Sequence, residues 1–177
     1  SAADTCYEAT ILGVAPESDA QVCARVSESV LRDSCYLRVS DRIGARQGDL
    51  PAVVATCQQA GKLMGPCSSH MVEKRIRFHA KRATIYDFGA DVQKMLELWP
   101  GLSEIRPFGT AVAKGRRALG YGEPVTALCD RLGSVAGAGC RYTTTSEQRY
   151  EWADRPPVDR QLRVLRDKWK QQDAAPR

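Results

Sequence analysis

Cysteine spacing restricts the possible folds of this chain more than any other feature. Six of its seven cysteines fall into three pairs of similar spacing, and Cys6 is left over: Cys23-x11-Cys35, Cys57-x9-Cys67 and Cys129-x10-Cys140. A chain of 177 residues can bury enough apolar surface to fold without cross-links. Because the cysteines are paired nonetheless, the sequence predicts disulfides and an oxidising compartment.

Two disulfide arrangements are compatible with this spacing. A step of ten to twelve residues along an unbroken helix spans about 15–18 Å, whereas a disulfide needs Cα atoms within about 7 Å. Either the first two helices form an antiparallel hairpin with nested bonds, or each pair closes its own helix–turn–helix. Gly65-Pro66 and the glycines near 133–139 supply turns for the second and third pairs. No Gly or Pro lies between Cys23 and Cys35, which favours nesting.

Hydrophobic periodicity predicts an all-α fold. Apolar residues recur at three- and four-residue steps from Asp19, which predicts one helix that ends at Gly44 or Gly48. A second helix is expected from Asp49, as N-cap, through Leu63. Gly65-Pro66 should end it, because proline lacks the amide donor.

The rest of the chain predicts further short helices. One covers Ser69 to about Arg82. A second begins with Asp87 or Asp91 as its cap and ends at Pro100-Gly101, and a third covers Pro124 to Leu132. Residues 107–123 hold four glycines and are expected to form a loop around a short helix. We therefore expect an irregular lead-in (1–17), a helical disulfide-containing domain (18–150) and a C-terminal helical extension (151–177).

The segment from Cys57 to Cys67 reads CQQAGKLMGPC and resembles the CX9C motif of CHCH proteins of the mitochondrial intermembrane space. Its Gly61-Lys62-Leu63 and the basic helix after it are similar to the multi-CX9C accessory subunit of respiratory complex I. The resemblance covers roughly residues 20–82. It implies a hairpin with bonds Cys23–Cys67 and Cys35–Cys57. It also implies a non-catalytic accessory subunit on the intermembrane-space side, peripheral to the inner membrane and bound to other protein subunits.

The sequence departs from that family in several ways, which include Pro66 where the family would continue a helix and a third cysteine pair without a counterpart, and a second resemblance competes with it. The first cysteine pair is separated by eleven residues rather than nine, and the connection from Cys35 to Cys57 is long. Helical-hairpin repeats of secreted bacterial proteins, similar to Sel1-like repeats, also place cysteines about ten residues apart. That resemblance implies local disulfides and a secreted or periplasmic repeat protein that binds a protein partner.

Motifs for catalysis or cofactor binding are absent from the sequence. It lacks the Gly-x-Ser-x-Gly and P-loop patterns, and no cofactor or enzymatic activity is expected. His70 and His79 would lie on opposite faces of one helix, about 180° apart. A zinc site on Cys67 and His70, with Cys57 and Cys35, lacks the paired short spacing typical of such sites. No metal is expected.

A formal charge of +5 allows acidic partners but does not by itself indicate nucleic acid, and none is expected. The densest basic run predicts contact with anionic lipid or an acidic partner through Lys74, Arg75, Arg77, Lys81 and Arg82. A second group, Lys114, Arg116 and Arg117, could extend it. The predicted final helix, Pro157 to Gln172, carries an apolar stripe for a partner: Val158, Leu162, Leu165 and Trp169.

Overall fold

The structure, a computed structural model, describes residues 16–46, 48–82, 86–120 and 122–145. These residues form α-helices joined by turns and contain no strand, so the all-α prediction is confirmed. The helices are α2 (Pro16–Ala24), α3 (Ser29–Arg46), α4 (Leu50–Cys57), α5 (Met64–Arg82), α6 (Phe88–Leu98), α7 (Arg106–Leu119), α8 (Val125–Arg131) and α9 (Ser134–Thr145). Two 3₁₀ turns are η1 (Gly61–Leu63) and η2 (Pro100–Glu104). The C-terminal extension at 151–177 lies outside the described residues, as does all of the lead-in except its last two residues.

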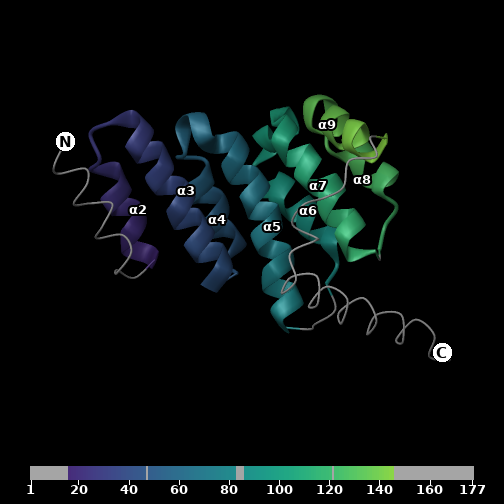
Figure 1. Cartoon of the computed structure of the whole chain (residues 1–177), viewed down its shortest axis with the longest axis horizontal. Helices are drawn as coiled ribbons and strands as arrows, with labels where there is room; N and C mark the ends of the chain where they lie inside the picture. Colours follow the sequence, from purple (N-terminus) through teal and green to yellow (C-terminus); the bar gives the residue numbers. More distant parts are fainter. Residues whose placement is uncertain (1–15, 47, 83–85, 121, 146–177) are drawn as a thin grey trace.

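The helices follow one another along the long axis of the molecule as consecutive pairs (Figure 1). The second helix of each pair packs on the second helix of the next, α3 on α5, α5 on α7 and α7 on α9. Cys57 follows Cys23 by 34 residues, and Cys129 follows Cys57 by 72, about two such steps. The described chain is therefore a stack of four helix pairs in which the third pair carries no cysteines, as in helical solenoids.

A continuous core runs through the stack. The second helices turn apolar side chains inward, including Val39 on α3, Ile76 on α5 and Val112 on α7, all at 0% exposure. Phe108 and Leu128 close the core toward the C-terminal pair. Because each pair buries its apolar face against its neighbours, the stack is held by contacts between consecutive units.

The predicted single helix from Asp19 to Gly44 is wrong, since the chain turns between α2 and α3. The backbone amides of Arg25 and Val26 donate to the carbonyls of Val22 and Cys23, each at 3.1 Å, which ends α2 in a tight turn. Val26 is buried within that turn. Burial of an apolar side chain therefore sets the turn, which has no Gly or Pro to mark it in the sequence.

The predicted break at Gly65-Pro66 is also wrong. Asp49 caps α4 as predicted, because its carboxylate accepts from the Ala52 amide at 3.2 Å. The helix then ends at Cys57, and α5 begins at Met64 rather than Ser69. Pro66 lies in the first turn of α5, where a missing amide costs no helical hydrogen bond.

The predicted loop at 107–123 is mostly the helix α7. Its internal glycines allow close helix packing instead of forming turns. A Cβ on Gly109 would lie 1.8 Å from the Ala136 carbonyl oxygen on α9, and one on Gly115 would lie 2.5 Å from the Ile76 side chain on α5. Gly120, with φ of 64°, ends α7 in the left-handed conformation that glycine favours.

Candidate binding site

The cysteine pairs form three local disulfides. Cys23 bonds Cys35, Cys57 bonds Cys67 and Cys129 bonds Cys140, with Cα–Cα distances of 5.5, 5.6 and 5.4 Å. Each bond joins the end of one helix to the following helix, and all six cysteines are buried. The nested bonds Cys23–Cys67 and Cys35–Cys57 are therefore not formed. Cys6 lies outside the described residues.

The Gly61-Lys62-Leu63 sequence forms η1 and has a structural role. The Lys62 amide donates to the Asp33 carboxylate on α3 at 3.0 Å. Gly61 has a φ of 51°, and a Cβ there would lie 2.4 Å from an Asp33 oxygen. A buried carboxylate thus holds the connection between the two disulfide-bonded helices of the second pair.

Arg75 faces the interior rather than the surface. Its guanidinium donates to both oxygens of Asp91 on α6, each at 2.8 Å, and to the Gly48 carbonyl. Tyr86 donates its hydroxyl to the same carboxylate at 2.7 Å. Burial, followed by the charge of Asp91, raises the pKa of Tyr86 well above its usual range. This network ties α5, α6 and the α3–α4 connection together.

The other residues of the predicted basic run lie near the surface. Lys81 and Arg82 are exposed, and Lys74 and Arg77 are half-buried. Arg77 pairs with Glu73 one turn earlier. In the second predicted group, Lys114 is half-buried and Arg117 is exposed, whereas Arg116 donates to the carbonyls of Gly122 and Glu123 and holds the α7–α8 loop.

The two histidines occupy different surroundings. His70 hydrogen-bonds Asp41 on α3 at 2.9 Å, and this bond raises its pKa above the usual 6.5. His79 stacks on Tyr86 with ring centroids 4.0 Å apart. Burial, then the charge of Arg75, lowers the pKa of His79. No group of three or more His, Cys, Asp or Glu within the described ranges is arranged to hold a metal ion.

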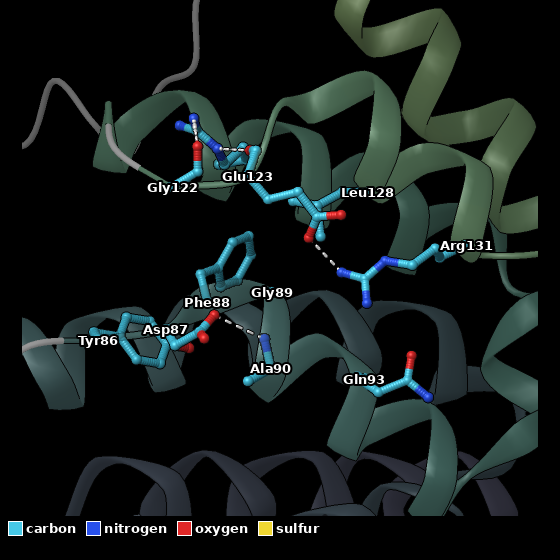
Figure 2. Close-up of a pocket in the computed structure, with 11 residues that line it drawn as sticks. Tyr86, Asp87, Phe88, Gly89, Ala90, Gln93, Gly122, Glu123, Leu128 and Arg131 are labelled. Carbon is cyan, nitrogen blue, oxygen red and sulfur yellow. Dashed lines mark hydrogen bonds and ion pairs between the residues drawn. The ribbon is translucent and has the colours of Figure 1, made fainter.

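A cavity of about 560 Å³ opens between the start of α6 and the loop that joins α7 to α8. Tyr86, Phe88 and Leu128 supply apolar lining, and Gln93 contributes an exposed amide. Figure 2 shows Glu123 paired with Arg131 across from the first turn of α6. Sequence reasoning singled out neither Gln93 nor the Glu123–Arg131 pair.

Three polar groups converge above Gly89 in this cavity. A Cβ at Gly89 would lie 2.7 Å from a Glu123 carboxylate oxygen, 3.3 Å from the Arg131 guanidinium and 3.5 Å from an Asp87 oxygen. Two of these groups already form an ion pair, Glu123 with Arg131. The third, Asp87, caps α6 by accepting from the Ala90 amide at 2.9 Å, as one of its two predicted caps (Figure 2). The Glu123–Arg131 pair therefore joins the α7–α8 loop to the end of α8, and Asp87 is used to cap α6.

The predicted partner stripe of the final helix, Val158, Leu162, Leu165 and Trp169, lies outside the described residues. None of the described helices combines the length and apolarity needed to cross a membrane. Comparison with protein-family models, with curated proteins and with solved structures gives no match to this chain.

Proposed function

We propose that this chain is a non-catalytic helical-repeat protein of an oxidising compartment, secreted or periplasmic, that works by binding a protein partner. The observation that carries the proposal is the pairing of the cysteines. Each disulfide closes one helix–turn–helix, and the resulting units stack into one elongated body (Figure 1). Solenoids of this kind present extended surfaces that suit macromolecular partners.

The roles of the polar groups also support a binding protein. Asp91 and Arg75 are used to join helices, Asp33 holds η1, and Arg116 holds the α7–α8 loop. In the cavity above Gly89, the Glu123–Arg131 pair is occupied with its own contact. These charged groups are committed to the architecture, which favours a rigid scaffold over a reactive site.

The accessory role in respiratory complex I is the second candidate, and η1 carries the Gly61-Lys62-Leu63 sequence on which that resemblance depends. Local pairing favours the repeat proposal over it, because the CHCH resemblance implies bonds across a hairpin. The disulfides would have the same effect in either setting, since each removes conformational freedom from the unfolded chain and contributes about 2–4 kcal/mol.

Mass spectrometry of the unreduced protein, alkylated during extraction from its native compartment, tests the proposal. We expect peptides that join Cys23 to Cys35, Cys57 to Cys67 and Cys129 to Cys140. In native size-exclusion chromatography, we expect the same extract to carry the protein in a complex larger than its own 19.5 kDa. Nested bonds, with co-migration of a respiratory complex, would establish the second candidate instead. Free thiols at all six positions would contradict both.

A further inference from the structure

The outward side of α9 carries an exposed apolar stripe. We call it the α9 stripe, and it consists of Val135, Ala138 and Tyr142. At about 100° per residue, these positions lie within about 60° of one another around the helix. Val135 is 37% exposed and Tyr142 is 58% exposed. Because Ala136 and Cys140 are buried on the other side of α9, the α9 stripe is a second apolar face on one helix.

The disulfide cysteine of α3 gives a reference point for the side of a second helix that meets the next unit. In α3, the residues five and nine positions after Cys35 face that unit. The Ser40 hydroxyl lies 3.2 Å from the Cys57 sulfur at the end of α4. A Cβ on Gly44 would lie 3.1 Å from the Cβ of Lys74 on α5. These two positions are about 140° and 180° around the helix from the cysteine.

The same sector of α5 faces its next unit. Val72 and Ile76 follow Cys67 by five and nine positions. A Cβ on Gly115 of α7 would lie 3.6 Å from the Val72 side chain and 2.5 Å from that of Ile76. Ser69, two positions after the cysteine and about 200° around the helix, donates its hydroxyl to a backbone carbonyl at the start of α7 at 3.0 Å. In both helices, the sector about 140–200° from the disulfide cysteine therefore receives the next unit.

The α9 stripe occupies this same sector of its helix. Counted from Cys140, its members lie between about 160° and 220° around α9. Tyr142 follows Cys140 by two positions, as Ser69 follows Cys67. The helix α9 is the last described one and lies at the end of the described stack (Figure 1). The side on which a next unit would pack is thus exposed within the described part of the chain.

We propose that the predicted final helix, Pro157 to Gln172, packs on the α9 stripe as the first helix of a fifth unit. The first helices α2, α4, α6 and α8 begin at residues 16, 50, 88 and 125, so their starts are 34, 38 and 37 residues apart. Pro157 follows the start of α8 by 32 residues, and proline is favoured in the first turn of a helix. The spacing of the units therefore places the next first helix where the sequence predicts one.

The predicted final helix has the apolar surface that this contact requires, and it can reach the α9 stripe. Its own stripe places four apolar side chains on one face: Val158, Leu162, Leu165 and Trp169. Residues 146–156 can span up to about 36 Å, whereas α9 is about 18 Å long. Because the helix is tethered beside the α9 stripe, its effective concentration there is in the millimolar range. Tethering favours this helix over a second copy or a separate partner.

Photo-cross-linking of the full chain identifies what covers the α9 stripe. Tyr142→p-benzoylphenylalanine puts the cross-linker where an exposed aromatic ring already lies. A mixture of ¹⁵N-labelled and unlabelled chains is irradiated, and the linked peptides are mapped by mass spectrometry. We expect links from this position to residues 157–172 of the same chain. Links between labelled and unlabelled chains would show a second copy as the occupant, and links to other segments, or none, would also overturn the proposal.

Hydrogen–deuterium exchange measures whether the contact protects the final helix. The helix variant combines Leu162→Lys with Leu165→Lys. Its matched control, Val164→Lys with Gln171→Lys, adds the same charge on the opposite face of the predicted helix. We expect residues 157–172 to exchange at least tenfold faster in the helix variant and less than twofold faster in the control. No protection of this segment in the unmodified chain, or equal effects of variant and control, would overturn the proposal.

A second pair of variants changes only the described helices. Tyr142→Lys should also raise exchange in residues 157–172 at least tenfold, because it places a charge in the contact. Val30→Lys, at a 61% exposed apolar position on α3, should leave that segment unchanged. Unchanged exchange in α5 and α7 checks that both proteins keep their fold. Protection of residues 157–172 that survives Tyr142→Lys would show that the helix packs elsewhere. The proposed function is tested separately by the disulfide map.

Discussion

Asp91 accepts hydrogen bonds from Arg75 and Tyr86 in a largely buried position, where each of the two charged side chains is only 11% exposed. Bidentate pairing of a guanidinium with a carboxylate offsets much of the cost of burying both charges. A variant that removes one partner leaves the other charge buried and unpaired. The network is therefore more sensitive to the loss of a charge than to the loss of the tyrosine hydroxyl.

We expect Asp91→Ala to lower the free energy of unfolding by about 3–5 kcal/mol, because Arg75 stays buried without its counter-ion. Tyr86→Phe, the control, should cost only about 1 kcal/mol, since it removes one hydrogen bond to a carboxylate that keeps its guanidinium partner. Urea denaturation followed by circular dichroism measures both. Similar losses in the two variants would show that the ion pair is not the main contributor.

The two histidines should titrate on opposite sides of 6.5. The pKa of His70 is raised by its bond to Asp41. The stabilisation that this bond gives is therefore complete below pH 6.5 and is lost as the pH rises through the raised pKa of the folded state. The pKa of His79 is lowered by burial, so the native state loses stability as the pH falls below 6.5. NMR titration resolves both rings, since the chain has two histidines.

Asp41→Asn is the control for the His70 assignment. It should return the pKa of His70 toward 6.5 and leave that of His79 unchanged. Because His70 is 42% exposed, the effect of the pair on stability should stay below about 1 kcal/mol. A raised pKa of His70 in the Asp41→Asn protein would contradict the assigned cause.

At the scale of the helices, glycine sets how closely α7 approaches its neighbours. Gly109 faces the backbone of α9, which cannot move aside without shifting the helix. Gly115 faces the end of the Ile76 side chain, which can change its rotamer. The two glycines lie in the same helix, so the gain in helix propensity on substitution by alanine, about 1 kcal/mol, is the same for both.

We expect Gly109→Ala to be destabilising by about 2–4 kcal/mol, because the overlap with the Ala136 carbonyl oxygen must force α7 and α9 apart. Gly115→Ala should change stability by less than about 1.5 kcal/mol, since repacking of Ile76 opposes the propensity gain. Thermal denaturation of the two variants makes the comparison. A larger loss for Gly115→Ala would show that the side chain, not the backbone, limits the packing.

Periodicity and end signals predicted those helices whose boundaries depend on local chemistry. The Asp49 and Asp87 caps and the stop at Pro100-Gly101 follow from backbone hydrogen bonding within a few residues, and the structure has all three. Boundaries set by burial were not predictable in this way. The turn at Val26 and the continuation of α7 through Gly109 and Gly115 depend on contacts with other helices. Glycine content alone predicts a loop at these two glycines, although they lie within a helix.

The same distinction holds for the candidate sites. The cysteine pairs were visible in the sequence, but their pairing depends on the unforeseen turn between α2 and α3. Arg75 and Lys81 look alike within the basic run, and only packing separates the buried ion pair of Arg75 from the surface position of Lys81. The Glu123–Arg131 pair joins a loop to a helix, and nothing in the local sequence marks it.

At the scale of the whole molecule, the principal contacts between the described helix pairs join neighbours in the stack, so stability should be distributed unit by unit. The Cys23–Cys35 bond belongs to the first described pair, whose only neighbour among the described pairs is the second. The Cys57–Cys67 bond belongs to the second pair, which lies between two others. Loss of the first bond should therefore act locally, whereas loss of the second should reach both neighbours.

We expect Cys23→Ala with Cys35→Ala to raise amide exchange by roughly 100-fold in α2 and α3, because the lost cross-link is worth about 3 kcal/mol for a loop of this length. Amides of α7 and α9 should exchange as before. The matched variant, Cys57→Ala with Cys67→Ala, should raise exchange in α3, α4, α5 and α7 together. Hydrogen–deuterium exchange with mass spectrometry resolves these segments. A uniform rise of amide exchange along the chain in either variant would mean that the stack unfolds as a single cooperative unit. The rigidity of the surface that a partner binds would then depend on all three disulfides together.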